Sequence, residues 1–147
     1  MRVVVCRVDS AVCRVDGEIT GKCGVGLLLY VGFHQDDTEE DVKKVASKIG
    51  RIRIFRDENG KISKSTSDVG GAALVISNFT LYGRVRHSNR PDFMLACPGD
   101  RANEYFELFK KELSAYMHVE SGIFGAHMHI DAQNDGPVTL VIESSEL

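Results

Sequence analysis

The 147-residue sequence contains no apolar run that approaches the roughly 20 residues needed to span a bilayer. The apolar stretch at the start is short and is interrupted by Arg7 and Asp9, so it predicts a first strand and not a signal peptide. Hydrophobic residues make up 43% and charged residues 27%, which is ordinary for a globular chain with a core. We therefore expect one cytoplasmic domain over residues 1–147, without a membrane segment.

A strong positive charge is also absent, since the formal net charge is −3. This argues against a protein that coats nucleic acid through bulk electrostatics. A local basic patch stays open, because phosphate contacts need only a few well-placed cations. Arg84, Arg86, His87 and Arg90 form one candidate patch, and a solvated arginine-rich loop is the alternative.

The four cysteines, at positions 6, 13, 23 and 97, form no CxxC pair, so the close ligand pairs of a structural zinc site are missing. Free and mostly buried thiols are expected. His127 and His129 lie two residues apart on a predicted strand and face the same side, but no third ligand is near them in the sequence. Surface histidines are thus favoured over a metal site.

Standard catalytic signatures are missing as well. The sequence has no GxSxG, HExxH, P-loop or GxGxxG motif. The chemistry must therefore be sought where polar residues interrupt an otherwise apolar pattern.

Hydrophobic periodicity predicts alternating strands and helices. Strands are expected at 2–8, 12–15, around 19, and at 25–33, 51–55, 73–81, 126–132 and 137–143, with helices after Asp37 or Thr38 and from Asp100. The predicted fold is a single three-layer α/β domain. It has two N-terminal hairpin strands, two strand–helix units and closing C-terminal strands, with the helices on one side of stacked sheets.

Polar residues end or separate strands in two places. Ser77-Asn78-Phe79-Thr80-Leu81 closes a buried strand, where it either cradles a polar ligand or caps the loop that follows. In Asn134-Asp135-Gly136-Pro137, the residue types between two predicted strands are typical of a hairpin turn, with Pro137 starting the next strand. An X-Pro bond is cis in only about 5–6% of cases in folded proteins.

Together these segments resemble the two signature motifs of the D-aminoacyl-tRNA deacylases, also called D-tyrosyl-tRNA deacylases. The likeness runs nearly from end to end, through SNFTL (77–81), NDGPVT (134–139), MRVVVCRV (1–8), SNRPDF (88–93) and GIFGAHM (122–128). The chain departs from the family at two positions, where Cys6 and Asn78 replace the usual glutamines.

The resemblance implies hydrolysis of the ester that joins a D-amino acid to the terminal adenosine of tRNA. Ser77, Asn78, Phe79 and Thr80 would form the catalytic segment, with the main-chain N–H groups of Phe79 and Thr80 stabilising the oxyanion. The 2′-hydroxyl of the substrate would help to activate water, and no cofactor is implied. A Thr80 nucleophile ranks second, because no base partner is evident.

The same resemblance assigns the rest of the site. The substrate pocket would contain Arg7, with Pro91, Phe93 and Ala96 near the adenine and Phe124 and Met128 near the aminoacyl group. Arg84, Arg86 and Arg90 would contact tRNA phosphates. Gly136-Pro137 would be cis and would enter the partner's active site in a symmetric homodimer, where it rejects L-amino acids. The rival is a non-catalytic nucleic-acid-binding protein on the same fold, and glycyl-tRNA is a possible second substrate.

Overall fold

The computed structural model describes all 147 residues and contains one large sheet, a small hairpin and two helices. Its strands are β1 (Arg2–Val15), β2 (Glu18–Cys23), β3 (Gly26–Gly32), β4 (Arg53–Arg56), β5 (Ile62–Ser65), β6 (Ala72–Ser77), β7 (His118–Ser121) and β8 (His129–Glu143). Its helices are α1 (Glu39–Arg51) and α2 (Gly99–Leu113), with short 3₁₀ helices η1 (Phe79–Tyr82) and η2 (Ser144–Glu146).

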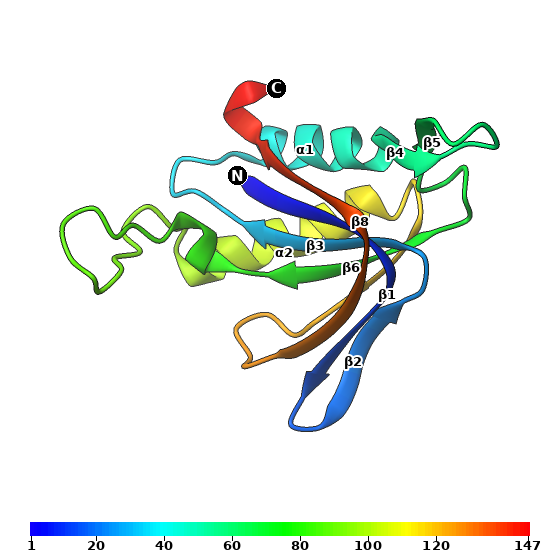
Figure 1. The fold of residues 1–147 in the computed structure, drawn as a ribbon. Coiled ribbons are helices and arrows are strands. Elements are labelled where there is room, and N and C mark those ends of the chain that lie inside the picture. Colours follow the sequence, from blue (N-terminus) through cyan, green and yellow to red (C-terminus); the bar gives the residue numbers. More distant parts are fainter.

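The large sheet has the order β2-β1-β3-β6-β7, and β8 pairs with the free side of β1. β3, β6 and β7 are parallel, whereas β1 runs antiparallel to β2, β3 and β8. Because β3 and β6 are parallel, their carboxyl ends meet at the same edge of the sheet (Figure 1). That edge carries the Ser77–Leu81 segment.

Both helices cover one face of this sheet. Their apolar sides pack against alternate residues of β1, β3 and β6 in the main core, which includes Leu27, Leu29, Ile49, Phe106 and Phe109. The apolar stripes predicted for the two helices therefore face the core. Thr38 caps α1, because its hydroxyl accepts a hydrogen bond from the Asp41 amide. No helix is long and apolar enough to cross a membrane.

A smaller core lies on the opposite face of the sheet, where β2 and the distal half of β1 form the third layer. Val8, Ala11, Cys13, Leu28 and Leu74 are among its buried members. The distal half of β1 bends away and carries β2 across the face of β6 and β7 (Figure 1). The approach is so close that a Cβ on Gly21 of β2 would lie 2.5 Å from the Ser121 carbonyl oxygen. The predicted fold class is confirmed, with the layers formed by one curled sheet.

The predicted hairpin turn at residues 134–137 is wrong. β8 runs without a break from His129 to Glu143, because both of its halves pair with β1 and not with each other. Thr139 pairs with Cys6 and Asn134 with Val8, so residues 135–138 form a bulge opposite Arg7. Within this bulge, the Gly136–Pro137 peptide bond is cis.

Other boundaries also differ from the prediction. The expected strands at 2–8 and 12–15 are both parts of β1, and Arg51 ends α1 instead of starting a strand. The expected strand 73–81 stops at Ser77, where η1 follows after Asn78. The sequence pattern does not predict β5 and β7, because each contains only one apolar residue and so shows no alternation.

Candidate active site

A cavity of about 630 Å³ opens at the carboxyl ends of β3 and β6. Thirteen of its eighteen lining residues are hydrophobic, and they come from β3, β6, η1, α2 and the segments around residues 93–97 and 124–130. A large apolar cavity with a few convergent polar groups is the usual form of a ligand site. Seven of the residues predicted for the site line it: Ser77, Asn78, Phe79, Phe93, Ala96, Phe124 and Met128.

The polar edge of this cavity is formed where β6 passes into η1. The Asn78 amide donates to the Val31 carbonyl oxygen at 2.8 Å, which ties the turn to β3. Gly32 permits this approach, because a Cβ there would lie 3.0 Å from the Asn78 carbonyl oxygen. The chain then tightens into a 3₁₀ turn, with the Leu81 amide donating back to the Asn78 carbonyl.

This turn leaves two neighbouring main-chain donors free. The first N–H groups of a helix have no intrahelical acceptor, and Asn78 supplies no side-chain cap. The amides of Phe79 and Thr80 accordingly have no acceptor within the protein. Adjacent main-chain donors beside an apolar cavity can stabilise a developing oxyanion.

Thr80 is exposed and does not line the cavity. Its hydroxyl donates to Oδ1 of Asn78 at 2.5 Å, and no histidine or carboxylate contacts it. An amide oxygen is not a base that removes a proton at neutral pH. The geometry therefore gives Thr80 no activating partner of the kind a nucleophile needs.

The cavity walls carry no Asp, Glu, Lys or Arg. Burial raises the pKa of Tyr30, which lines the cavity, so its phenol stays neutral at physiological pH. Burial likewise raises the pKa of Tyr82, the last residue of η1. The other titratable side chains that line the cavity are Cys97 and His127, and its fixed polar groups include the main-chain dipoles at the end of β6.

Arg7 is not in the cavity. It is buried at 3% exposure and donates through Nη1 to the Ile54 carbonyl at 2.6 Å and through Nε to the Asp135 carbonyl at 3.1 Å. Nε also lies 3.0 Å from Oδ2 of Asp135. In the single chain, Arg7 on β1 faces the bulge of β8 and holds the residue before Gly136, and its assignment to the substrate pocket stays a prediction.

Gly136 and Pro137 themselves are exposed and do not line the cavity of their own chain. Leu140 and Val141, farther along β8, are 38% and 59% exposed. β8 pairs only with β1, so its other edge is open. The second predicted segment thus lies on an uncovered strand, apart from the first.

Pro91 and the three predicted arginines lie on an exposed loop that leads away from η1 and returns at Phe93. Arg84 and Asp92 close this loop by two main-chain hydrogen bonds of 2.9 Å and an ion pair of 3.0 Å. Hydrogen bonds from Arg84 lower the pKa of the Asp92 carboxyl. Arg86 and Arg90 have no ion-pair partner, so they are the cations that remain free.

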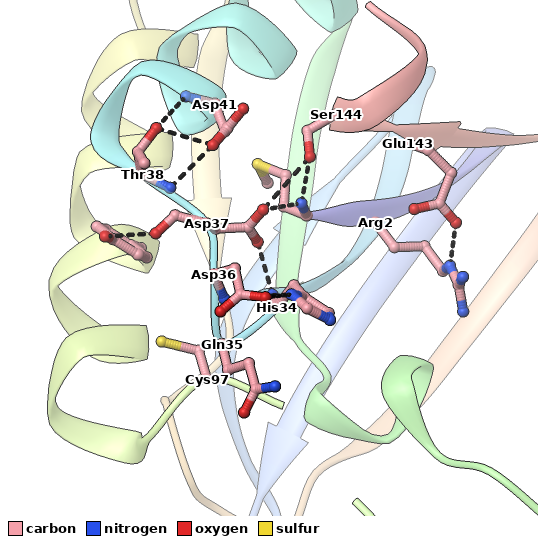
Figure 2. A network of polar contacts seen from close by, with 12 residues as sticks. Arg2, His34, Gln35, Asp36, Asp37, Thr38, Asp41, Cys97, Glu143 and Ser144 are labelled. Atoms are coloured by element: carbon pink, nitrogen blue, oxygen red, sulfur yellow. Dashed lines mark hydrogen bonds and ion pairs between the residues drawn. The ribbon is translucent and has the colours of Figure 1, made fainter. Parts of the chain in front are cut away.

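The opposite wall of the cavity depends on the segment His34–Asp37. Cys97 and Gln35 donate from their main chains to the carbonyls of Phe33 and Leu95, each at 2.9 Å. Asp37 anchors the segment, since its carboxylate accepts from the amide of His34 and from the N-terminal ammonium (Figure 2). This network fixes the wall that carries Ala96 and Cys97.

Sequence reasoning missed several lining residues, among them Tyr30, Cys97 and His127. Tyr30 is the one polar side chain in the apolar run of β3, and that interruption was the available signal. The rings of His127 and His129 lie 5.0 Å apart. No group of three or more metal-ligating side chains accompanies them.

The family model described as D-Tyr-tRNA(Tyr) deacylase matches residues 4–143. The chain belongs to this family. A D-aminoacyl-tRNA deacylase of Bacillus cytotoxicus is 49% identical, with 98% of this chain and 99% of the relative covered. That of Clostridium acetobutylicum is 45% identical over 100% of this chain and 99% of the relative.

Two solved structures resemble the deacylase fold described above. The "c-Myc DNA Unwinding Element Binding Protein" is 38% identical, with a TM-score of 0.91 and coverage of 97% of this chain and 98% of the other. A "probable eukaryotic D-amino acid tRNA deacylase" has a TM-score of 0.82 over 96% of this chain and 97% of the other. At 17% identity, the second likeness concerns the fold alone.

Proposed function

We propose that this protein is a tRNA-editing hydrolase that cleaves the ester bond of D-aminoacyl-tRNA and releases the free D-amino acid and tRNA. The observation that carries the proposal is the pair of free amides at Phe79 and Thr80 beside a cavity that no Asp, Glu, Lys or Arg lines. Membership of the D-Tyr-tRNA(Tyr) deacylase family supports the substrate class. Aminoacyl-tRNA is made in the cytoplasm, and we expect the enzyme to act there.

In this mechanism the ester carbonyl oxygen accepts hydrogen bonds from the amides of Phe79 and Thr80. As water attacks the carbonyl carbon, the oxygen gains negative charge, which fixed donors in an apolar cavity stabilise more strongly than bulk water does. No carboxylate or lysine lines the cavity to activate that water. The neighbouring 2′-hydroxyl of the substrate ribose supplies this assistance.

The cavity divides between the two halves of the substrate. Phe93 and Ala96 receive the terminal adenine, with Phe93 packed edge-on against Phe79 at 5.0 Å between ring centroids. Phe124 and Met128 lie toward the aminoacyl group. Arg86 and Arg90 contact phosphates of the acceptor end, whereas Arg84 holds the loop closed.

The functional unit in this proposal is a symmetric homodimer in which Gly136 and Pro137 enter the partner's cavity. Support comes from their exposure, from the open edge of β8 and from its exposed Leu140 and Val141. Selection against L-amino acids needs a fixed feature near the substrate Cα, where enantiomers differ whatever their side chain. Main-chain groups at Gly136 meet that need without reading the side chain.

The proposed activity is tested by turnover. Purified protein is incubated with D-tyrosyl-tRNA, L-tyrosyl-tRNA and glycyl-tRNA, and release of the amino acid is followed over many equivalents. We expect multiple turnovers of the D-substrate, slower hydrolysis of glycyl-tRNA and little of the L-substrate. A terminal 2′-deoxyadenosine should slow the reaction sharply. Equal rates on both enantiomers would contradict the proposal.

Composite sites are tested by mixing two inactive variants. Gly136→Ala leaves the cavity intact, and Ala96→Trp fills the cavity but leaves Gly136 intact. A mixed dimer restores one complete site, so mixing and exchanging subunits should recover activity that neither variant has alone. No recovery in confirmed mixed dimers would mean that each chain works by itself.

A second candidate function is nucleic-acid binding without catalysis. It is favoured by the likeness to a protein named for binding a DNA unwinding element. The net charge of −3 and the free amides beside the cavity favour the hydrolase. Stoichiometric retention of D-tyrosyl-tRNA without release of amino acid would favour binding alone.

A further inference from the structure

We propose that Arg2 is a positioning residue for the oxyanion donors, acting through the far end of η1. This inference rests on the hydrolysis proposed above. Arg2 does not line the cavity. Its Nη1 donates to the Leu81 carbonyl oxygen at 2.7 Å, which lies in the turn that carries the amides of Phe79 and Thr80.

The need for such a support follows from the size of the turn. η1 has four residues, and a helix this short gains little stability from its own hydrogen bonds. Its first end is tied to β3 by the Asn78 amide and the Val31 carbonyl. At its last end, the Gly83 amide donates to the Thr80 carbonyl at 2.9 Å, within the turn itself. Arg2 supplies the hydrogen bond that ties this end to the sheet, beside the packing of the Leu81 side chain against Gly32 of β3.

The guanidinium of Arg2 is itself held in place. Its Nε donates to Oε1 of Glu143 on β8 (Figure 2), and its Cζ lies 5.0 Å from the centroid of the Tyr82 ring. The planar fork of an arginine can bond two acceptors at once and stack on an aromatic face, which a lysine ammonium cannot do in the same way. Arg2 thereby links β1, β8 and η1 at one point.

The strand register shows how Arg2 also connects η1 to the segment that contains Gly136 and Pro137. Arg2 and Glu143 are paired positions on β1 and β8. Glu143 belongs to the same strand as Gly136 and Pro137. The ion pair therefore places the oxyanion turn at a fixed position relative to the strand that carries the proposed stereochemical element.

The chain offers a matched control in Arg14. It also lies on β1, and its Nη1 forms an ion pair with Oδ2 of Asp131 on β8 at 2.6 Å. Its side chain is 39% exposed, against 37% for Arg2. Arg14 contacts no atom of η1, so its removal takes away a β1–β8 ion pair without touching the turn.

The experiment compares Arg2→Met, Arg2→Lys and Arg14→Met in single-turnover and steady-state hydrolysis of D-tyrosyl-tRNA. Misplaced donors cost transition-state stabilisation, so Arg2→Met should lower kcat about tenfold with KM within about twofold. Arg2→Lys should recover only part of the loss. Arg14→Met should match the wild type in both constants.

Equal kcat values for Arg2→Met and Arg14→Met would overturn the inference, as would an effect confined to KM. Hydrogen exchange of the peptide covering residues 78–83 gives a readout without substrate. It should be faster in Arg2→Met than in Arg14→Met. If the wild type fails to turn over, the proposed hydrolysis is wrong, and unchanged exchange would then reject the anchoring role separately.

Discussion

The two polar segments that interrupt strands lie in opposite surroundings. Residues 77–81 sit at the inner edge of the sheet beside the cavity, and main-chain bonds to β3 hold them. Residues 134–139 lie on the open strand β8, where Arg7 holds the bulge from beneath and Gly136 faces outward. Similar sequence signals thus produce one segment that completes a cavity and one that the chain leaves uncovered.

Under the proposed mechanism, a single chain therefore contains only one of the two parts that each complete site needs. The inner segment has donors but no feature near the place of the substrate Cα. The outer segment has main-chain groups but no cavity of its own. The strongest tests perturb one segment and ask whether the other still functions.

The largest effect is expected from Gly136→Ala. A Cβ at Gly136 would lie 2.5 Å from the amide nitrogen of Val138, and φ there is +139°, which side chains rarely adopt. The bulge must shift, so hydrolysis of D-tyrosyl-tRNA should fall about hundredfold. Gly60→Ala is the control, since φ there is also positive but nothing lies within 4 Å. Comparable rates of hydrolysis in Gly136→Ala and Gly60→Ala would show that the segment 134–139 has no special role in the reaction.

A smaller effect is expected on the loop that leaves η1. Arg86→Ala with Arg90→Ala removes the two unpaired cations and should weaken tRNA binding roughly tenfold at low salt. The slope of log affinity against log salt concentration should fall by about 1 for each phosphate that an arginine no longer binds. The preference for D over L should not change. Arg53→Ala with Arg56→Ala removes two exposed arginines of β4 and serves as the control for the two removed charges. An unchanged slope in the variant that lacks Arg86 and Arg90 would show that these two arginines are only solvated.

A still smaller effect is expected from Thr80→Ala. The hydroxyl donates only to Asn78, so its loss should change kcat less than about threefold if the main-chain amides do the work. Rates of deacylation under single-turnover conditions measure this directly. A loss of several orders of magnitude in a folded variant would revive Thr80 as the nucleophile and remove the inner segment's assigned role.

The least effect on activity is expected from Thr38→Ala, which lies outside both segments. Loss of this helix cap should lower the free energy of unfolding by about 1 kcal/mol and leave kcat unchanged. Hydrogen bonds from Thr38 lower the pKa of Asp41, so their stabilising effect is present above the unfolded carboxyl pKa and is lost as the pH falls through the folded value. The difference in unfolding free energy between wild type and variant should therefore shrink below about pH 4.

Much of the fold follows from local pattern. The apolar run of β3 and the stripes of α1 and α2 predict elements that are buried as expected, because periodicity reports which face a core will cover. The sequence predicts a cap at Asp37 or Thr38, and in the structure Thr38 is the cap. The cysteines are free and mostly buried, as their spacing indicates.

The family and the places of both polar segments can be recognised from the sequence, because motif identity and apolar periodicity are local properties. The folded structure alone shows that residues 134–137 form no hairpin, since that depends on β8 pairing with β1 along both of its halves. It also decided that Arg7 supports the bulge, that Arg84 is paired with Asp92 and that Tyr30 and Cys97 line the cavity. These facts follow from contacts between residues far apart in the chain, which no local pattern records.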